Sequence, residues 1–211
     1  TAQPGARELA AGTNELTLRF EGQSASGVKL VKSYTFKRGS YTIAVKHEVT
    51  NGTAAALTPQ LYLQLARDGN PPEGESSFYF TFTGPALYTE ANKFRKLDFK
   101  DIEKGKADHD KTANGGWISM VQHYFVSAWL PAAEGPREYF ARKVEGTPFY
   151  SVGLLKTLSV APGATVVSDD RLFVGPQQEK LLAELAPGLD LVKDYGIFHV
   201  IAKPLFWLLD K

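Results

Sequence analysis

Apolar and polar residues alternate in short runs along most of the chain, from Leu16 to Val174. Residues 28–37 and 41–50 form two such runs, and the KRGS sequence between them is typical of a hairpin turn. Further runs occupy residues 16–20, 59–66, 78–82, 138–144, 149–154, 158–160 and 164–174. Because side chains of a strand point to opposite faces in turn, this alternation predicts strands with one face buried.

The stretch GGWISMVQHYFVSAWLP, residues 115–131, breaks this alternation because it is apolar at almost every position. Its aromatic and β-branched residues favour two strands, with a bend near Gln122 and His123. A strand that is apolar on both faces must be covered on both. We therefore expect a central strand pair, with Trp117, Phe125 and Trp129 in the core.

About a dozen strands at roughly ten-residue spacing predict an all-β protein, a sandwich or a barrel. Residues 1–14 are small and polar, which predicts a flexible N-terminal arm before the β domain of residues 15–174. Residues 90–111 are dense in charge of both signs, and the apolar positions from Phe94 to Ile102 suggest one more strand there.

Helices are expected only in the C-terminal segment, residues 175–211. Gly175 and Pro176 are typical of a helix start, and Pro187-Gly188 of its end. In residues 189–211, apolar side chains recur at steps of three and four, as on one face of a helix. Such a helix can dock on the sheet, but its aromatic residues and lysines favour one that lies on a membrane surface. The predicted membrane-interface residues are Leu191, Tyr195, Phe198, Ile201, Leu205, Phe206 and Trp207.

Composition narrows the function classes. Lys and Arg number 24 against 23 Asp and Glu, so no net field favours nucleic acid, and we expect no nucleic-acid partner. The chain has no cysteine, which removes disulfides, thiolate catalysis and zinc–thiolate sites. No run reaches the approximately 18 apolar residues of a membrane span, and the first residues do not read as a signal peptide.

Candidate chemistry is sparse. Asp108-His109-Asp110 can be imagined as metal ligands, but in an extended chain the two carboxylates and the imidazole point to opposite sides, which favours a polar turn. Asp169 and Asp170 are neighbours and would likewise face opposite sides of a strand. Histidines 47, 123 and 199 have no partner at a catalytic spacing. We expect no catalytic, metal or cofactor site, although groups that meet only in the fold leave no local spacing.

Three segments carry a resemblance to a known family: GGWISMVQHYFVSAWLP, the FVGP of residues 173–176, and LDLVKDYGIFHVIAKPLFWLL of residues 189–209. Together they resemble the large periplasmic domain of the bacterial YidC membrane protein insertase. The resemblance implies a β-supersandwich related to galactose mutarotase, excised from a multi-pass protein on the periplasmic side of the inner membrane. It also implies that the whole protein acts alone or with the Sec translocon. The implied partners are the accessory subunits SecD and SecF and client membrane proteins.

Two hypotheses of different classes follow. In the first, the domain is a non-enzymatic spacer, docking or weak chaperone module of an insertase, and its C-terminal helix faces the membrane. In the second, it is a carbohydrate-binding or carbohydrate-converting sandwich like a mutarotase. Kinship of fold does not bring sugar chemistry with it, because function resides in the site.

Overall fold

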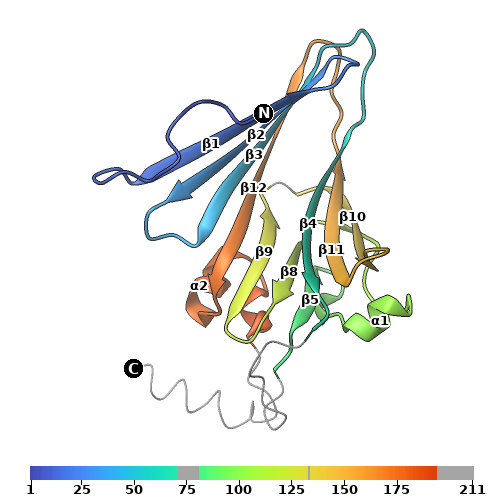
Figure 1. Ribbon diagram of the computed structural model, residues 1–211. Helices are drawn as coiled ribbons and strands as arrows, with labels where there is room; N and C mark the ends of the chain where they lie inside the picture. Colours follow the sequence, from blue (N-terminus) through green and yellow to red (C-terminus); the bar gives the residue numbers. More distant parts are fainter. Residues whose placement is uncertain (71–80, 133, 194–211) are drawn as a thin grey trace.

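Two antiparallel sheets form the body of the protein (Figure 1). The computed structural model describes residues 1–70, 81–132 and 134–193. The strands are β1 (Glu15–Gln23), β2 (Val28–Lys37), β3 (Thr42–Asn51), β4 (Gln60–Asp68), β5 (Gly84–Thr89), β6 (Lys93–Lys96), β7 (Thr112–Asn114), β8 (Trp117–Val121), β9 (Phe125–Pro131), β10 (Pro136–Lys143), β11 (Phe149–Thr157) and β12 (Thr165–Pro176). The helices are α1 (Phe99–Glu103), α2 (Glu179–Leu185) and the 3-10 turn η1 (Leu189–Val192). The all-β class with helices near the C-terminus is confirmed.

The two sheets differ in width. The large sheet has eight strands in the order β1-β2-β3-β12-β9-β8-β5-β6, and the small sheet has four in the order β4-β11-β10-β7. Every pairing among these strands is antiparallel. Figure 1 shows β1, β2 and β3 fanning away from β4, β10 and β11. The small sheet therefore covers only part of the inward face of the large one.

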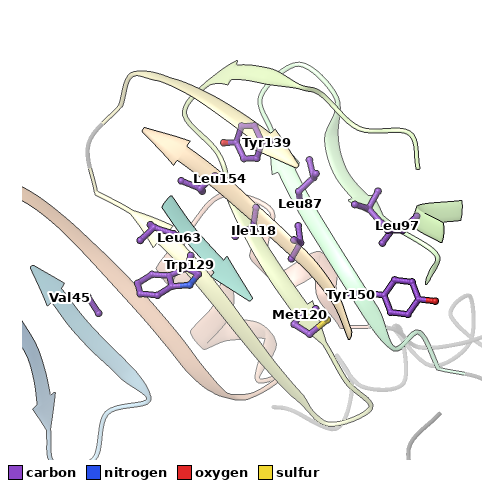
Figure 2. Packing of buried hydrophobic residues seen from close by; sticks show 12 residues of the cluster. Val45, Leu63, Leu87, Leu97, Ile118, Met120, Trp129, Tyr139, Tyr150 and Leu154 are labelled. Carbon is purple, nitrogen blue, oxygen red and sulfur yellow. The ribbon is translucent and has the colours of Figure 1, made fainter. Parts of the chain in front are cut away.

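The strand pair β8–β9 lies in the interior of the large sheet and is covered on both faces. On one face Ile118, Met120 and Trp129 pack in a cluster with side chains of the small sheet (Figure 2). On the other face Trp117 belongs to a second cluster that includes Leu182 of α2, with η1 residues. The doubly apolar stretch is thus buried between a sheet and a pair of helices, as expected for a run without alternation.

Backbone geometry at the start of β8 depends on glycine. Gly116 has a φ of 108°, a conformation that other residues rarely adopt. A Cβ atom at this position would lie 2.2 Å from the carbonyl oxygen of Tyr88 on the neighbouring strand β5. This close approach lets Trp117 stack on Tyr88, with ring centroids 5.7 Å apart and planes 8° apart.

Phe125 was expected in the core, and this prediction is wrong: its side chain is 56% exposed. Trp117 and Trp129 are only 2% and 6% exposed. Phe125 is the first residue of β9 and pairs with Pro176 at the very end of β12. It therefore lies at the margin of the large sheet, where the covering layers end, while its neighbour Val126 is buried.

Other boundaries also differ from expectation. The expected strand from Phe94 to Ile102 is a short strand, β6, followed by helix α1, whose start is capped by the Asp98 side chain accepting from the Lys100 N–H. Pro176 ends β12, and α2 begins three residues later than the glycine–proline signal indicated. Strand β5 was not anticipated, because its six residues are all buried and show no alternation. Residues 158–160 form only an isolated bridge between Val160 and Leu57.

Candidate functional site

The inward face of β1 and β2 extends beyond the small sheet. Cross-strand partners share a face, and the inward-facing pairs here include Leu18 with Tyr34 and Phe20 with Lys32. Tyr34 packs against the inter-sheet core, which fixes which face is inward. We call this surface the open face; it consists of Leu16, Leu18, Phe20, Leu30, Lys32, Tyr34 and Phe36.

Apolar groups on the open face remain accessible to solvent. Phe20 is 37% exposed and Leu30 is 41% exposed. The rings of Phe20 and Tyr34 meet edge to face with centroids 6.0 Å apart, and Lys32 Nζ lies 5.0 Å from the Tyr34 ring centroid. Contiguous exposed apolar side chains are a feature of surfaces that contact another molecule.

A buried charged cluster joins the two sheets. His47 of β3, Ser168 and Asp170 of β12 face inward from the large sheet, and Lys156 of β11 faces them from the small sheet. Lys156 Nζ donates to Asp170 Oδ1 at 2.5 Å and to Ser168 Oγ at 2.7 Å. Ser168 Oγ donates in turn to Asp170 Oδ2 at 3.2 Å. All four residues are at most 9% exposed.

The charges in this cluster stabilise one another. Burial on its own would raise the pKa of the Asp170 carboxyl, but the contacts with His47, Lys156 and Ser168 outweigh it and hold the pKa below its ordinary value of 3.8. His47 Nδ1 is 3.6 Å from Asp170 Oδ2, longer than a hydrogen bond, and makes no hydrogen bond in the described part of the chain. The Lys156–Asp170 pair is therefore the strong contact of the cluster.

The cluster is a poor candidate for catalysis. A serine–lysine hydrolase needs a neutral amine that accepts the hydroxyl proton. Here the Lys156 ammonium donates to both Ser168 and Asp170, and the Ser168 proton is directed to the carboxylate. The four side chains are also shielded from solvent, so no substrate carbonyl can reach Ser168 Oγ without opening the sandwich. The arrangement instead clamps the two sheets together.

The other histidines of the described chain are also placed without a catalytic partner. His109 Nδ1 donates to the Asp110 carbonyl at 2.7 Å, while Nε2 accepts from Lys111 Nζ at 2.9 Å. Burial lowers the pKa of His109 below its usual 6.5, which keeps the imidazole neutral near pH 7. The Asp110 carboxylate accepts from Thr89 and Asn92 and so holds the turn between β5 and β6. His123 hydrogen-bonds Thr81 and contacts the Tyr124 ring.

Most residues of the predicted membrane-interface helix lie outside the described residues: Tyr195, Phe198, Ile201, Leu205, Phe206 and Trp207. Leu191 is described, and in η1 it is 47% exposed while its neighbours Leu189 and Val192 are fully buried. Within the described ranges no three side chains gather as metal ligands. Among the helices described, none is long and apolar enough to cross a membrane.

Sequence reasoning missed the charged cluster, although one signal was present. Lys156 interrupts the run YSVGLLKTL, whose other positions are almost all apolar or small. A lysine inside such a run is seldom buried unless it is paired. Its partners, Ser168 and Asp170, come from the next strand in the chain but from the other sheet, so no spacing pointed to them.

A protein-family model described as the YidC periplasmic domain matches residues 1–208. The membrane protein insertase YidC of Janthinobacterium sp. (strain Marseille) is 55% identical over 99% of this chain and 37% of its own length. The protein of the same name from Cupriavidus necator is 51% identical over the whole chain and 38% of its own length. The chain thus spans a little over a third of the length of these curated relatives.

Solved structures show a likeness of fold at low identity. The GH36 α-galactosidase AgaB from Geobacillus stearothermophilus aligns with a TM-score of 0.51 and 12% identity, covering 87% of this chain and 28% of that chain. A galactose mutarotase-like protein from Lactobacillus casei aligns with a TM-score of 0.48 and 11% identity, covering 79% and 72%. At 12% identity the α-galactosidase likeness concerns the fold alone.

Proposed function

Because the chain belongs to the family of YidC periplasmic domains, we propose that it serves a membrane protein insertase as a non-catalytic docking and spacer module. Its place is the periplasmic side of the bacterial inner membrane. The observation that carries this proposal is the family match across residues 1–208, together with relatives named insertases. Insertion of client proteins would be the work of the whole protein, of which this domain is a part.

The geometry supports a role without chemistry. The buried ion pair of Lys156 with Asp170 links the two sheets, and Lys156 Nζ donates its hydrogen bonds to Asp170 and Ser168. The exposed groups of the open face, such as Phe20 and Leu30, are apolar and offer contact area rather than reactivity.

The partners we propose are segments of client membrane proteins and the accessory Sec subunits SecD and SecF. Partly folded clients expose apolar side chains, which suit the apolar open face with Lys32 at its centre. The membrane surface is a further partner, contacted by the segment that follows Lys193 in the sequence.

A first test separates this proposal from a sugar-active sandwich. We expect the purified chain to show no mutarotase or hydrolase activity and no millimolar or tighter binding of mono- or oligosaccharides in calorimetry. Replacing His47, His109 or His123 with alanine should leave insertion by the full-length protein intact wherever the variant keeps its fold. A mutarotase rate that disappears with one of these substitutions would contradict the non-catalytic role.

A second test concerns the C-terminal segment. Phe198→Asp together with Leu205→Asp should weaken binding of the chain to liposomes and impair insertion by the full-length protein, because charges on the apolar stripe are costly to bring to a bilayer. The melting midpoint of the β domain should not change, which controls for unfolding. Normal insertion by the double variant would mean that the segment is only a structural connector.

A further inference from the structure

We propose that the ends of β3, β9 and β12 form a rim that rests on lipid headgroups through Tyr41, Tyr124, Phe125 and Val174. The inference builds on the proposed function, which puts a bilayer near this domain, and adds which part of the sandwich faces it. The occupant is an anionic phospholipid surface.

The four rim side chains are unusually exposed for their size. Tyr41 is 50% exposed, Val174 47%, Tyr124 70% and Phe125 56%. They are neighbours in space although they come from three separate parts of the chain. The Val174 N–H donates to the Tyr41 carbonyl at 2.9 Å, and Phe125 pairs with Pro176 across β9 and β12. Tyr41 packs on the face of β12 that carries Phe173, whereas Val174 and Phe125 lie on the opposite face, so the rim side chains flank both faces of one end of the large sheet.

Hydrogen bonds hold the rim in place. The Gln177 N–H donates to the Tyr124 carbonyl at 2.9 Å, and its side-chain amide donates to the carbonyls of Gln122 and Phe125 at 2.6 and 3.3 Å. The Tyr41 ring packs against the fully buried Phe173 with centroids 6.4 Å apart. The exposed rings are therefore presented by an ordered edge, so contact with a surface costs little conformational entropy.

The charge pattern fits an anionic surface. The rim segments 39–43, 122–127 and 172–178 contain no aspartate or glutamate. Lys37 and Arg38 directly precede the first segment. The Lys37 side chain is 65% exposed, with its Nζ 3.8 Å from Glu15 Oε2, and the Arg38 guanidinium donates to carbonyls of the N-terminal loop. Two of the rim residues are tyrosines, whose apolar ring and polar hydroxyl suit the headgroup region. Cations near the surface attract anionic lipids.

The chain also leaves the sheet at this end. Figure 1 places α2 beside the ends of β9 and β12, and Arg171 Nη2 donates to the Leu185 carbonyl at 3.0 Å to hold it there. The sequence that follows Lys193, proposed above as the membrane-binding segment, therefore starts from the same end of the molecule as the rim.

The absence of cysteine allows a clean test by site-specific labelling. Single cysteines replace Phe125 or Tyr41 and carry an environment-sensitive fluorophore; the matched control replaces Tyr62, which is 61% exposed on β4 of the small sheet. Each chain is tethered by a C-terminal hexahistidine tag to vesicles of phosphatidylglycerol and phosphatidylcholine that contain a nickel-chelating lipid. The measured quantity is quenching by a lipid-borne nitroxide. Far-UV circular dichroism verifies the fold of each variant.

We expect the labels at Phe125 and Tyr41 to be quenched and blue-shifted, and the label at Tyr62 to remain as in water. Without the tether, Tyr124→Ser with Phe125→Ser should weaken partitioning into the same vesicles by about tenfold. If the rim labels behave like the Tyr62 label on tethered chains, the rim faces water or protein and the proposal fails.

Failure of the rim proposal and failure of the proposed function give different results. If the rim labels are not quenched while the Phe198→Asp, Leu205→Asp variant is impaired in insertion, the proposed function is supported and the rim proposal is wrong. Quenched rim labels with normal insertion by that variant would keep the rim and make the C-terminal segment a structural connector.

Discussion

Replacing Asp170 with alanine is expected to lower the free energy of unfolding by about 3–5 kcal/mol, because it leaves the Lys156 ammonium buried without its counter-ion. Asp170 is 2% exposed, and its carboxylate is the common acceptor of Lys156 and Ser168. The loss would be visible as a fall in the denaturant midpoint without a change in the slope of the transition. In a chain of this size it corresponds to a melting midpoint lower by about 10 °C.

The matched control removes both charges. Lys156→Met with Asp170→Leu replaces the pair by apolar groups, and such exchanges are often neutral or stabilising. We expect the double variant to be more stable than Asp170→Ala alone. If both variants lose the same stability, the packing of Asp170 matters rather than its charge, and the clamp between the sheets is not electrostatic.

The Lys156–Asp170 pair also predicts how the free energy of unfolding depends on pH. The pKa of Asp170 is lower in the folded chain than its ordinary value of 3.8, so its contribution is fully present above about pH 4 and is lost as the pH falls through the folded pKa. The unfolding free energy of the wild-type chain should therefore drop in this acidic range. The drop should be smaller in the Lys156→Met, Asp170→Leu variant, which has no such carboxylate.

Replacing Trp129 with alanine is the second large effect, about 3–5 kcal/mol of destabilisation from lost contacts and a cavity. Trp129 packs between the sheets (Figure 2), and its Nε1 donates to the Gln64 carbonyl of β4 at 3.1 Å, joining the large sheet to the small one. Phe125→Ala in the same strand is the control, with an expected loss below about 1 kcal/mol because that side chain is mostly exposed. Equal losses for the two variants would contradict the placement of the core.

The central strand pair could be predicted because its signal is local. Residues 117–121 and 125–131 are apolar on both faces, and such a run requires two covering layers. Which elements form these two layers could not be read from the stretch itself, because one layer is the small sheet and the other includes α2. Phe125 was misplaced for the same reason, since hydrophobicity predicts burial only where a covering layer reaches.

Short helices and strands were not predicted because they are too short to show a hydrophobic period. α1 has five residues, less than two turns, and its clearest signal was the cap at Asp98. Its register is set by tertiary contacts, among them Phe99 against Tyr150 with ring centroids 4.9 Å apart. The charged cluster escaped because His47, Lys156 and Asp170 are separated by many residues and meet only when the sheets close.

Photo-crosslinking from the open face in the intact insertase tests the docking role most directly. A photoreactive amino acid replaces Phe20 or Leu30 on that face, and Val167, which is 47% exposed and pairs with Glu48 on the opposite face of the large sheet, serves as the control. We predict covalent adducts with client membrane proteins or with SecD and SecF from Phe20 and Leu30, and none from Val167. Absence of any polypeptide adduct from the open face during active insertion would contradict the docking role.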